Sequence, residues 1–333
     1  MDSANHRFWM GEKMATGLVE LSRDPAVLDD GNFWAVSTTF EGEFTFARFE
    51  NITLESFANE VNDAEKSTNA LWQSDMNKEE YCSYVEEIRE AIADGHVYQV
   101  NACRQISRTG VSGSLSPLFE KILKENPAPF SSYLSLPGIE IASASPELFI
   151  KRAGNALTSS PIKGTKELNS GEFGEKDKSE NIMIVDLMRN DLGQVCIPGS
   201  VDVSDLLRTE DHPGLSHLVS DVIGTLKSGV TWNEIWQALL PAGSISGAPK
   251  SSAIKLIKEK ERTPRGPYCG VLGWVHGNEA LLSVAIRIFW KKEDDVLRFG
   301  TGAGITWGSN PEQEWLETEL KARKLIAIAE GAQ

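Results

Sequence analysis

Apolar residues recur along this chain with two periods, helical spacing and strand alternation, and the two types follow one another along the sequence. The pattern predicts, in chain order, a helix over 78–95, a strand over 98–108, a hairpin over 140–162, a helix over 181–193 and three strands between 270 and 305. Strands that arrive in hairpins, with helices between the groups, favour an α+β fold with antiparallel sheets over a doubly wound parallel sheet.

The polar stretch 62–80 has the composition of a surface connection. We therefore divide the chain into an N-terminal segment, residues 1–75, packed on the same body as a larger domain, residues 76–333. No low-complexity linker and no obvious repeat interrupts the larger part.

Composition and charge exclude several classes of protein. With 41% hydrophobic and 24% charged residues, the chain is globular. Its net charge of −15 opposes contact with nucleic acid, so an anionic substrate would need a local basic site or a cation. No apolar run spans a membrane and the start has no secretory pattern, so we expect a cytoplasmic protein. The four cysteines are far apart, which indicates reduced core residues without zinc or disulfides.

Two acidic pairs stand out. Asp177 and Glu180 are three residues apart at the start of a predicted helix, as are Glu314 and Glu317 in another. Each pair has a structural interpretation: Asp177 as N-cap of a capping box, and Glu314 and Glu317 in a solvated stripe with Lys321 and Lys324. Together they form the all-oxygen donor set that Mg²⁺ prefers.

Other candidates remain open on residue type alone. Arg287 lies in an apolar strand pattern and is either a paired structural arginine or a planar fork for a carboxylate. His217 has the spacing of an amphipathic helix, where a structural histidine is the commoner outcome. Gly302 and Gly304, in a G-x-G-x-G run at the end of a hairpin, either expose backbone amides to an anion or make a tight turn; a dinucleotide site is not indicated.

Ordered blocks over most of the chain resemble the chorismate-utilising enzymes, a family that includes anthranilate synthase. The blocks are "YQVN" (98–101), "SPE" (145–147), "PIKGT" (161–165), "ENIMIVDLMRNDL" (180–192), "SHLVS" (216–220), "GSISGAPK" (243–250), "GPYCGVLGW" (266–274), "AIRIF" (285–289), "GTGAGI" (300–305) and "ETELKAR" (317–323). The resemblance implies two facing antiparallel sheets with helices outside. It is loose over the first seventy or so residues, which read as a divergent and shortened segment, so a tryptophan pocket is not transferred to "GLVELSRD".

Within the family, "PIKGT" resembles the aminodeoxychorismate synthases, whereas anthranilate synthases carry alanine in place of Lys163. The resemblance implies that Lys163 attacks chorismate covalently before ammonia displaces it, giving 4-amino-4-deoxychorismate on the way to 4-aminobenzoate and folate. The lysine must be unprotonated, which requires a lowered pKa. Glu147 matches the family's general acid. Without the surrounding blocks, both residues would be read as exposed.

The remaining roles are also implied by the resemblance. Glu180 and Glu317 are expected as Mg²⁺ ligands, with Asp177 and Glu314 close by or bridged by water. His217 is expected near the reacting ring as a catalytic residue, and substrate binding is expected from Gly164, Thr165, Ser244, Tyr268, Arg287, Gly302, Gly304 and Lys321.

The chain has no G-x-C-x-G elbow, so ammonia is expected from a separate glutamine amidotransferase subunit or from solution. Two alternatives stay open: conversion of chorismate to anthranilate or to isochorismate or salicylate, and a Mg²⁺-dependent binding subunit without turnover. The other conversions of chorismate do not explain the lysine in "PIKGT" as well, and the binding subunit would leave chorismate unchanged.

Overall fold

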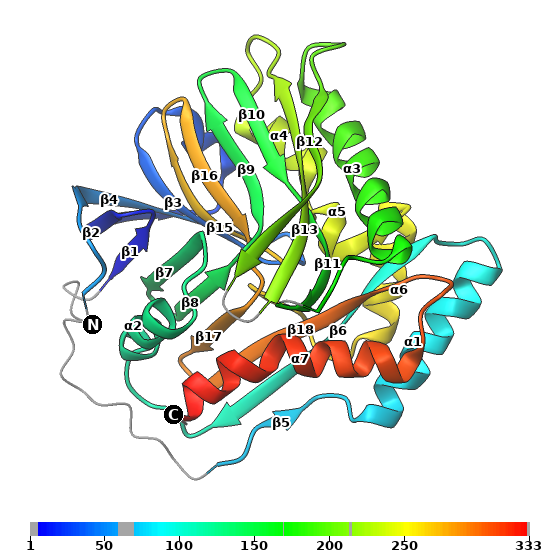
Figure 1. Ribbon diagram of the computed structural model, residues 1–333. Coiled ribbons are helices and arrows are strands. Elements are labelled where there is room, and N and C mark those ends of the chain that lie inside the picture. Colours follow the sequence, from blue (N-terminus) through cyan, green and yellow to red (C-terminus); the bar gives the residue numbers. More distant parts are fainter. Residues whose placement is uncertain (1–5, 59–69, 169, 213–214, 332–333) are drawn as a thin grey trace.

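The computed structural model describes residues 6–58, 70–168, 170–212 and 215–331 (Figure 1). Within these ranges, antiparallel hydrogen bonding joins strands and helices cover them, which confirms the predicted α+β class. The strands are β1 (Arg7–Met10), β2 (Lys13–Ser22), β3 (Phe33–Thr38), β4 (Phe44–Leu54), β5 (Gln73–Ser74), β6 (Gln99–Thr109), β7 (Phe130–Leu136), β8 (Ile139–Ser145), β9 (Leu148–Ala153), β10 (Ala156–Ser160), β11 (Ile162–Glu167), β12 (Asp202–His212), β13 (Leu215–Thr225), β14 (Gly247–Ala248), β15 (Val271–His276), β16 (Glu279–Val284), β17 (Ile288–Lys292) and β18 (Val296–Ile305). The helices are the 3-10 helix η2 (Pro25–Asp29) and α1 (Lys78–Ala93), α2 (Ser116–Glu125), α3 (Glu175–Val195), α4 (Trp232–Leu239), α5 (Gly243–Ser246), α6 (Lys250–Lys260) and α7 (Pro311–Glu330).

The strands form one continuous antiparallel ladder. Its order is β6–β18–β17–β8–β7–β1–β2–β4–β3–β15–β16–β9–β10–β13, with β5 and β14 beside β6 and with β11 and β12 beside β13. The two ends of this ladder face each other across one pocket, because β6 and β18 line it from one layer and β11 and β13 from the other. The expected pair of facing sheets is thus built from a single folded ladder.

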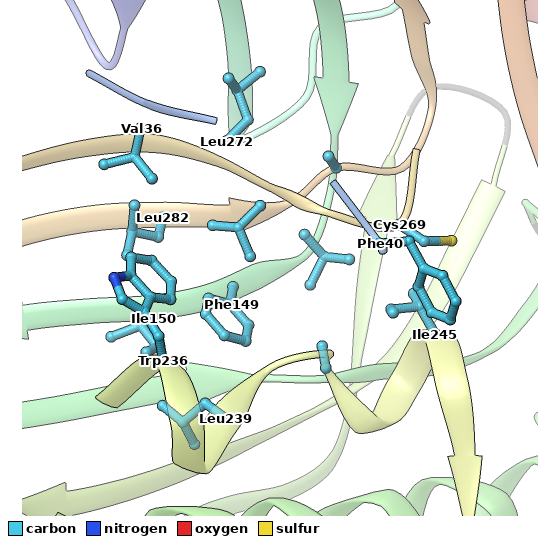
Figure 2. Packing of buried hydrophobic residues seen from close by; sticks show 14 of the residues in the cluster. Val36, Phe40, Phe149, Ile150, Trp236, Leu239, Ile245, Cys269, Leu272 and Leu282 are labelled. Atoms are coloured by element: carbon cyan, nitrogen blue, oxygen red, sulfur yellow. The ribbon is translucent and has the colours of Figure 1, made fainter. Parts of the chain in front are cut away.

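Helices cover the outer surfaces of both layers. Helices α7 and α2 pack on the β18 and β8 layer, and α3 packs on β13 and contacts α4 (Figure 1). The first cluster of buried apolar residues extends from the N-terminal strands to α3, α4 and α6, and within it Trp236 stacks on Phe149 with nearly parallel rings (Figure 2). A second cluster holds α2 and α7 to the sheet through Phe119, Phe289 and Leu325. Burial of these large side chains fixes the two layers, and therefore the walls of the pocket.

The N-terminal strands are part of the ladder. Strand β1 pairs with β7, and β3 pairs with β15, so residues before 75 hydrogen-bond to strands far along the chain. The division at residue 75 stays a prediction. The expected connection over 62–80 is only partly described, since residues 59–69 lie outside the described ranges, and its last residues already belong to α1.

Two sequence predictions about local structure are wrong. His217 lies on strand β13, not on a helix; the apolar positions there fit either period, and pairing with β11, β10 and β12 selects the strand. Helix α3 begins at Glu175, three residues earlier than an N-cap at Asp177 would place it, so Gly174 is the N-cap. Asp177 is therefore the third helical residue, and its carboxylate accepts a hydrogen bond from the Gly174 amide at 3.1 Å.

Candidate active site

One pocket between the two layers collects nearly all of the predicted site residues. All of them line its wall except Glu314, which lies behind it on α7. They come from segments far apart in the chain: the β8–β9 connection, β11, α3, β13, α5, the loop before β15, the loop before β17, β18 and α7. The fold therefore assembles the site from many segments of the chain rather than from one local motif.

Lys163 is the second residue of β11 and is directed into the protein. Its Nζ donates a hydrogen bond to the carbonyl oxygen of Ser244 at 2.7 Å. Burial lowers the pKa of Lys163, although the negative charge of Glu180 opposes that change. The next residue, Gly164, has φ +85°, and a Cβ there would lie 3.0 Å from the Cβ of Asp177. A glycine at this position lets α3 approach the strand that carries the lysine.

Glu147 lies between β8 and β9 and is buried. Burial raises its pKa to about 7, while a hydrogen bond from Ser244 and the nearby charge of Lys163 act in the opposite direction. The carboxyl group is thus half protonated near neutral pH. Ser244 links the two residues. Its carbonyl oxygen accepts a hydrogen bond from Lys163, and its hydroxyl group donates one to the carboxylate of Glu147.

Arg287, His217 and Thr165 form the opposite wall. Arg287 has an unusual positive φ of 54°, and its guanidinium lies 2.7 Å from Nε2 of His217. Burial and the charge of Arg287 lower the pKa of His217 to about 2, so the ring is neutral. Because a guanidinium only donates, Nε2 must accept, and Nδ1 carries the hydrogen that is donated to Oγ1 of Thr165 at 3.1 Å.

Arg287 carries a buried charge without a carboxylate partner. Burial lowers its pKa to about 10, although the nearby charge of Glu147 opposes that change. Among the described residues, no carboxylate lies within ion-pair distance of the guanidinium, so a role in binding a carboxylate stays a prediction. A buried, uncompensated guanidinium favours an anion in the pocket.

The end of the pocket between α3 and α7 mixes carboxylates with lysines. Lys176 Nζ lies 2.9 Å from Glu314 and 3.8 Å from Glu180, and Lys321 lies 2.6 Å from Glu317. Burial raises the pKa of Glu180 to about 7. Burial acts in the same direction on Glu317, but the combined effect of Lys321, Lys176 and Lys163 is larger and lowers that pKa.

The predicted solvated stripe on α7 is partly wrong. Lys324 is exposed, but the side chain of Glu314 is only 3% exposed, because α7 turns this face toward α3 and Lys176 covers it. The donor chemistry of Glu180, Glu314 and Glu317 fits a hard cation, and Oε1 of Glu180 has no hydrogen-bond partner among the described residues. In the described parts of the chain, however, no three acidic, histidine or cysteine side chains converge closely enough to hold an ion as they stand.

Gly302 and Gly304 lie inside strand β18, not in a turn. A Cβ at Gly302 would lie 2.6 Å from the carbonyl oxygen of Ala102, and one at Gly304 would lie 2.5 Å from Nε2 of Gln99. Glycine is needed at both positions for close packing against β6. Contact of their amides with a carboxylate stays a prediction.

Sequence reasoning missed two residues of the site. Lys176 lines the pocket, and its spacing of four from Glu180 was the available signal. Gln99 is 1% exposed, and neither atom of its side-chain amide has a hydrogen-bond partner in the described structure. It lies beside Gly304, as do Lys163 and Glu180. Its position in the "YQVN" block was the available signal.

The remaining expectations concern the whole chain. All four cysteines are free, and three of them are buried. Among the described residues, none of the helices combines the length and the apolar character that a membrane crossing requires.

An enclosed pocket with a buried amine, a carboxyl group that titrates near pH 7 and an unpaired guanidinium defines the class: a protein that binds a small anion and has groups for nucleophilic and acid chemistry. The profile of the chorismate binding enzymes matches residues 49–327, so the chain belongs to the chorismate binding enzyme family.

Relatives within this family differ in their named activities. The chain is 37% identical to "Anthranilate synthase component 1" of Saccharolobus solfataricus, over 77% of this chain and 63% of that protein. It is 35% identical to "Aminodeoxychorismate synthase component 1" of Salmonella typhimurium, over 77% of this chain and 59% of that protein. The chain thus spans about 60% of the length of these relatives.

Solved structures share the fold at low identity. An isochorismate synthase, DhbC, of Bacillus anthracis superimposes with a TM-score of 0.84 at 20% identity, covering 99% of this chain and 97% of that one. Component I of anthranilate synthase from Streptococcus pneumoniae gives 0.80 at 22% identity, covering 98% and 93%. These matches establish the fold. They do not identify the reaction, which must be argued from the residues of the pocket.

Proposed function

We propose that the protein is an aminodeoxychorismate synthase component that converts chorismate and ammonia to 4-amino-4-deoxychorismate. The observation that carries this proposal is Lys163: an amine buried in the pocket, with a lowered pKa, beside a carboxyl group whose pKa is about 7. Burial lowers the pKa of this amine and so favours its neutral form, which is the nucleophile.

In the first step, the Lys163 amine bonds to C2 of chorismate, the ring π electrons shift, and the C4–O bond breaks. Hydroxide is a poor leaving group, so Glu147 donates its proton and the oxygen leaves as water. The new bond makes Nζ cationic, and it loses one proton to return to a neutral secondary amine. A carboxyl group with a pKa of about 7 still holds its proton in half of the molecules at that pH.

In the second step, ammonia bonds to C4, the π electrons shift back, and the C2–N bond to Lys163 breaks. The lysine takes up one proton as it leaves, and the attacking nitrogen loses one. The sum is chorismate plus ammonia giving aminodeoxychorismate plus water. The side-chain oxygen of Gln99 has no hydrogen-bond partner in the described structure, and this amide lies beside Gly304, as Lys163 does, so it would offer an acceptor to an N–H group there.

The two carboxylates of chorismate would meet different ends of the pocket. Arg287, fixed by its contact with His217, would bind the enolpyruvyl carboxylate as a charge-assisted fork, together with Tyr268 and the amides of Gly302 and Gly304. Glu180 and Glu317 would hold Mg²⁺, which would neutralise the ring carboxylate and fix it in place. An acidic protein could in this way accept a dianion.

Ammonia would come from a separate glutamine amidotransferase or from solution, because none of the four cysteines lies in a G-x-C-x-G sequence. A cytoplasmic location and a role in 4-aminobenzoate supply are part of the same proposal. The 37% identity to an anthranilate synthase component supports a second candidate, formation of anthranilate.

The test is incubation of the purified protein with chorismate, Mg²⁺ and ammonium, with the products separated by chromatography and identified by mass. We expect aminodeoxychorismate from the native chain and at least a hundredfold less from Lys163→Ala. Lys166→Ala, on the same strand, is the matched control and should retain activity. Anthranilate or isochorismate from the native chain would overturn the proposal.

A further inference from the structure

Lys176 occupies the space among the carboxylates that would hold a cation. It lies one turn before Glu180 on α3, and its ammonium group contacts Glu314 from α7 at 2.9 Å and approaches Glu180 at 3.8 Å. It therefore joins the two helices that carry the acidic pairs. Mg²⁺ requires oxygen ligands at about 2.0–2.1 Å. While the ammonium group of Lys176 lies between the carboxylates, they cannot coordinate a metal ion directly at that point.

Three lysines compensate the acidic cluster, and they differ in how firmly they are held. Lys163 is buried and bonded to Ser244. Lys321 pairs with Glu317 and also donates to the carbonyl oxygen of Gly302 at 2.9 Å. The Lys176 side chain is 47% exposed, while its partner Glu314 is 3% exposed. Of these three lysines, Lys176 thus has the most exposed side chain, and it can move into solvent.

The carboxylates cannot stay together without a cation. Glu314 and Glu180 are close to each other and largely removed from water, so the loss of Lys176 would leave repelling charges in a poorly solvated place. As the residues stand, no three acidic groups of the described chain converge on one point. A metal must therefore replace the ammonium group before the carboxylates can close around it.

We propose that Lys176 is an internal counter-ion that holds the acidic cluster together in the metal-free protein and is displaced into solvent when a divalent cation binds. The inference rests on the proposed function, because it takes the cation to be Mg²⁺. It goes beyond that function by assigning a role to a pocket residue that the proposed reaction steps do not use. The affinity for Mg²⁺ is then set by a competition between the metal and the lysine.

Two consequences follow for Lys176→Met, which keeps most of the length of the side chain and removes its charge. Mg²⁺ should bind roughly tenfold more tightly, because its competitor is gone. The metal-free variant should melt at a lower temperature than the native protein, because Glu314 loses its partner, and added Mg²⁺ should restore more stability to the variant than to the native chain.

Lysine labelling tests the displacement itself. The full chain is treated briefly with an amine-acetylating reagent with and without MgCl₂, and acetylation at each lysine is measured by peptide mass spectrometry. We expect the labelling of Lys176 to rise several-fold with Mg²⁺. Lys178, on the same helix and paired with Glu175 at 2.8 Å, is the matched control and should not change.

Calorimetric titration with MgCl₂ separates the possible failures. If the native protein binds Mg²⁺ while Lys176→Met binds it with the same affinity and the labelling of Lys176 does not change, the counter-ion role is wrong and the proposed function stands. If the native protein binds no Mg²⁺, the metal requirement of the proposed function fails together with this inference. Tighter binding by Lys176→Met and increased labelling of Lys176 in the native chain support it.

Discussion

The two ends of the pocket handle charge in opposite ways. At one end, Arg287 is buried without a carboxylate partner and is bonded only to the neutral ring of His217. At the other end, Glu180, Glu314 and Glu317 are compensated by lysines of the same chain. The arginine end can therefore bind an anion directly. At the carboxylate end, a metal ion must replace a lysine before an anion can bind.

The difference indicates how one pocket can distinguish the two carboxylates of a single small molecule. A buried guanidinium binds a carboxylate directly and gains from the low dielectric around it. Carboxylates can meet another carboxylate only through a cation between them. The orientation of the substrate would follow from this asymmetry, and changes at one end should leave ligand binding at the other end intact.

The largest effect is expected at the arginine end. Arg287→Met should weaken chorismate binding by about 10²–10³-fold, or roughly 3–4 kcal/mol, because a charge-assisted fork is lost. Calorimetry with chorismate measures this effect, and Mg²⁺ titration of the same variant should give the native affinity. Arg298→Met, which removes a surface pair with Asp294, is the control. Equal losses of chorismate and Mg²⁺ affinity would show that the two ends are not independent.

Glu147, between the two ends, should make stability depend on pH. Its pKa is raised by burial from 4.5 to about 7 in the folded protein, so the unfolded chain releases this proton first as the pH rises. As the pH rises from 4.5 to 7, the free energy of unfolding of the native protein should therefore fall by up to about 3 kcal/mol relative to that of Glu147→Gln.

Denaturant unfolding of both proteins at pH 5 and pH 8 measures this loss, with Glu120→Gln on the surface of α2 as the control. A stability difference that does not change with pH would mean that Glu147 is not buried in this way.

The next effect concerns the carboxylate end. Glu317→Gln should weaken Mg²⁺ binding by about 10–100-fold, since an anionic ligand becomes neutral. Glu312→Gln, exposed on the same helix, should bind Mg²⁺ normally. Metal titration by calorimetry checks both variants, and native affinity in Glu317→Gln would remove this residue from the proposed ligands.

The smallest effect is expected at Thr165, which acts through His217. Thr165→Val removes one acceptor for Nδ1–H and should lower kcat/KM about fivefold, or roughly 1 kcal/mol. ¹⁵N shifts of the ring should show a disturbed tautomer, and Thr165→Ser should restore both readouts. A normal tautomer in Thr165→Val would show that Arg287 and the backbone of Gly164 fix the ring without Thr165.

Much of the fold and of the site could be predicted from the sequence, because most of the site residues lie in blocks that occur in the family's order. Helix α1, strand β6 and the hairpin before Lys163 follow from periodicity and turn residues. His217 was misassigned because its apolar neighbours fit either period, and strand pairing over long distances decides between them. Lys176 was missed because its partner Glu314 lies 138 positions away, which no local pattern reveals. The positive φ of Arg287 is likewise imposed by the surrounding structure.

Trapping the lysine adduct tests the central claim most directly. The native chain and Lys163→Ala are incubated with chorismate and Mg²⁺ without ammonia, quenched with acid, and analysed as intact proteins and as peptides. We predict that a fraction of the native chain gains the mass of chorismate less one water, that the added mass maps to Lys163, and that ammonium removes it with release of aminodeoxychorismate. Formation of aminodeoxychorismate by Lys163→Ala at the native rate, with no adduct on the native chain, would contradict the proposed role of Lys163.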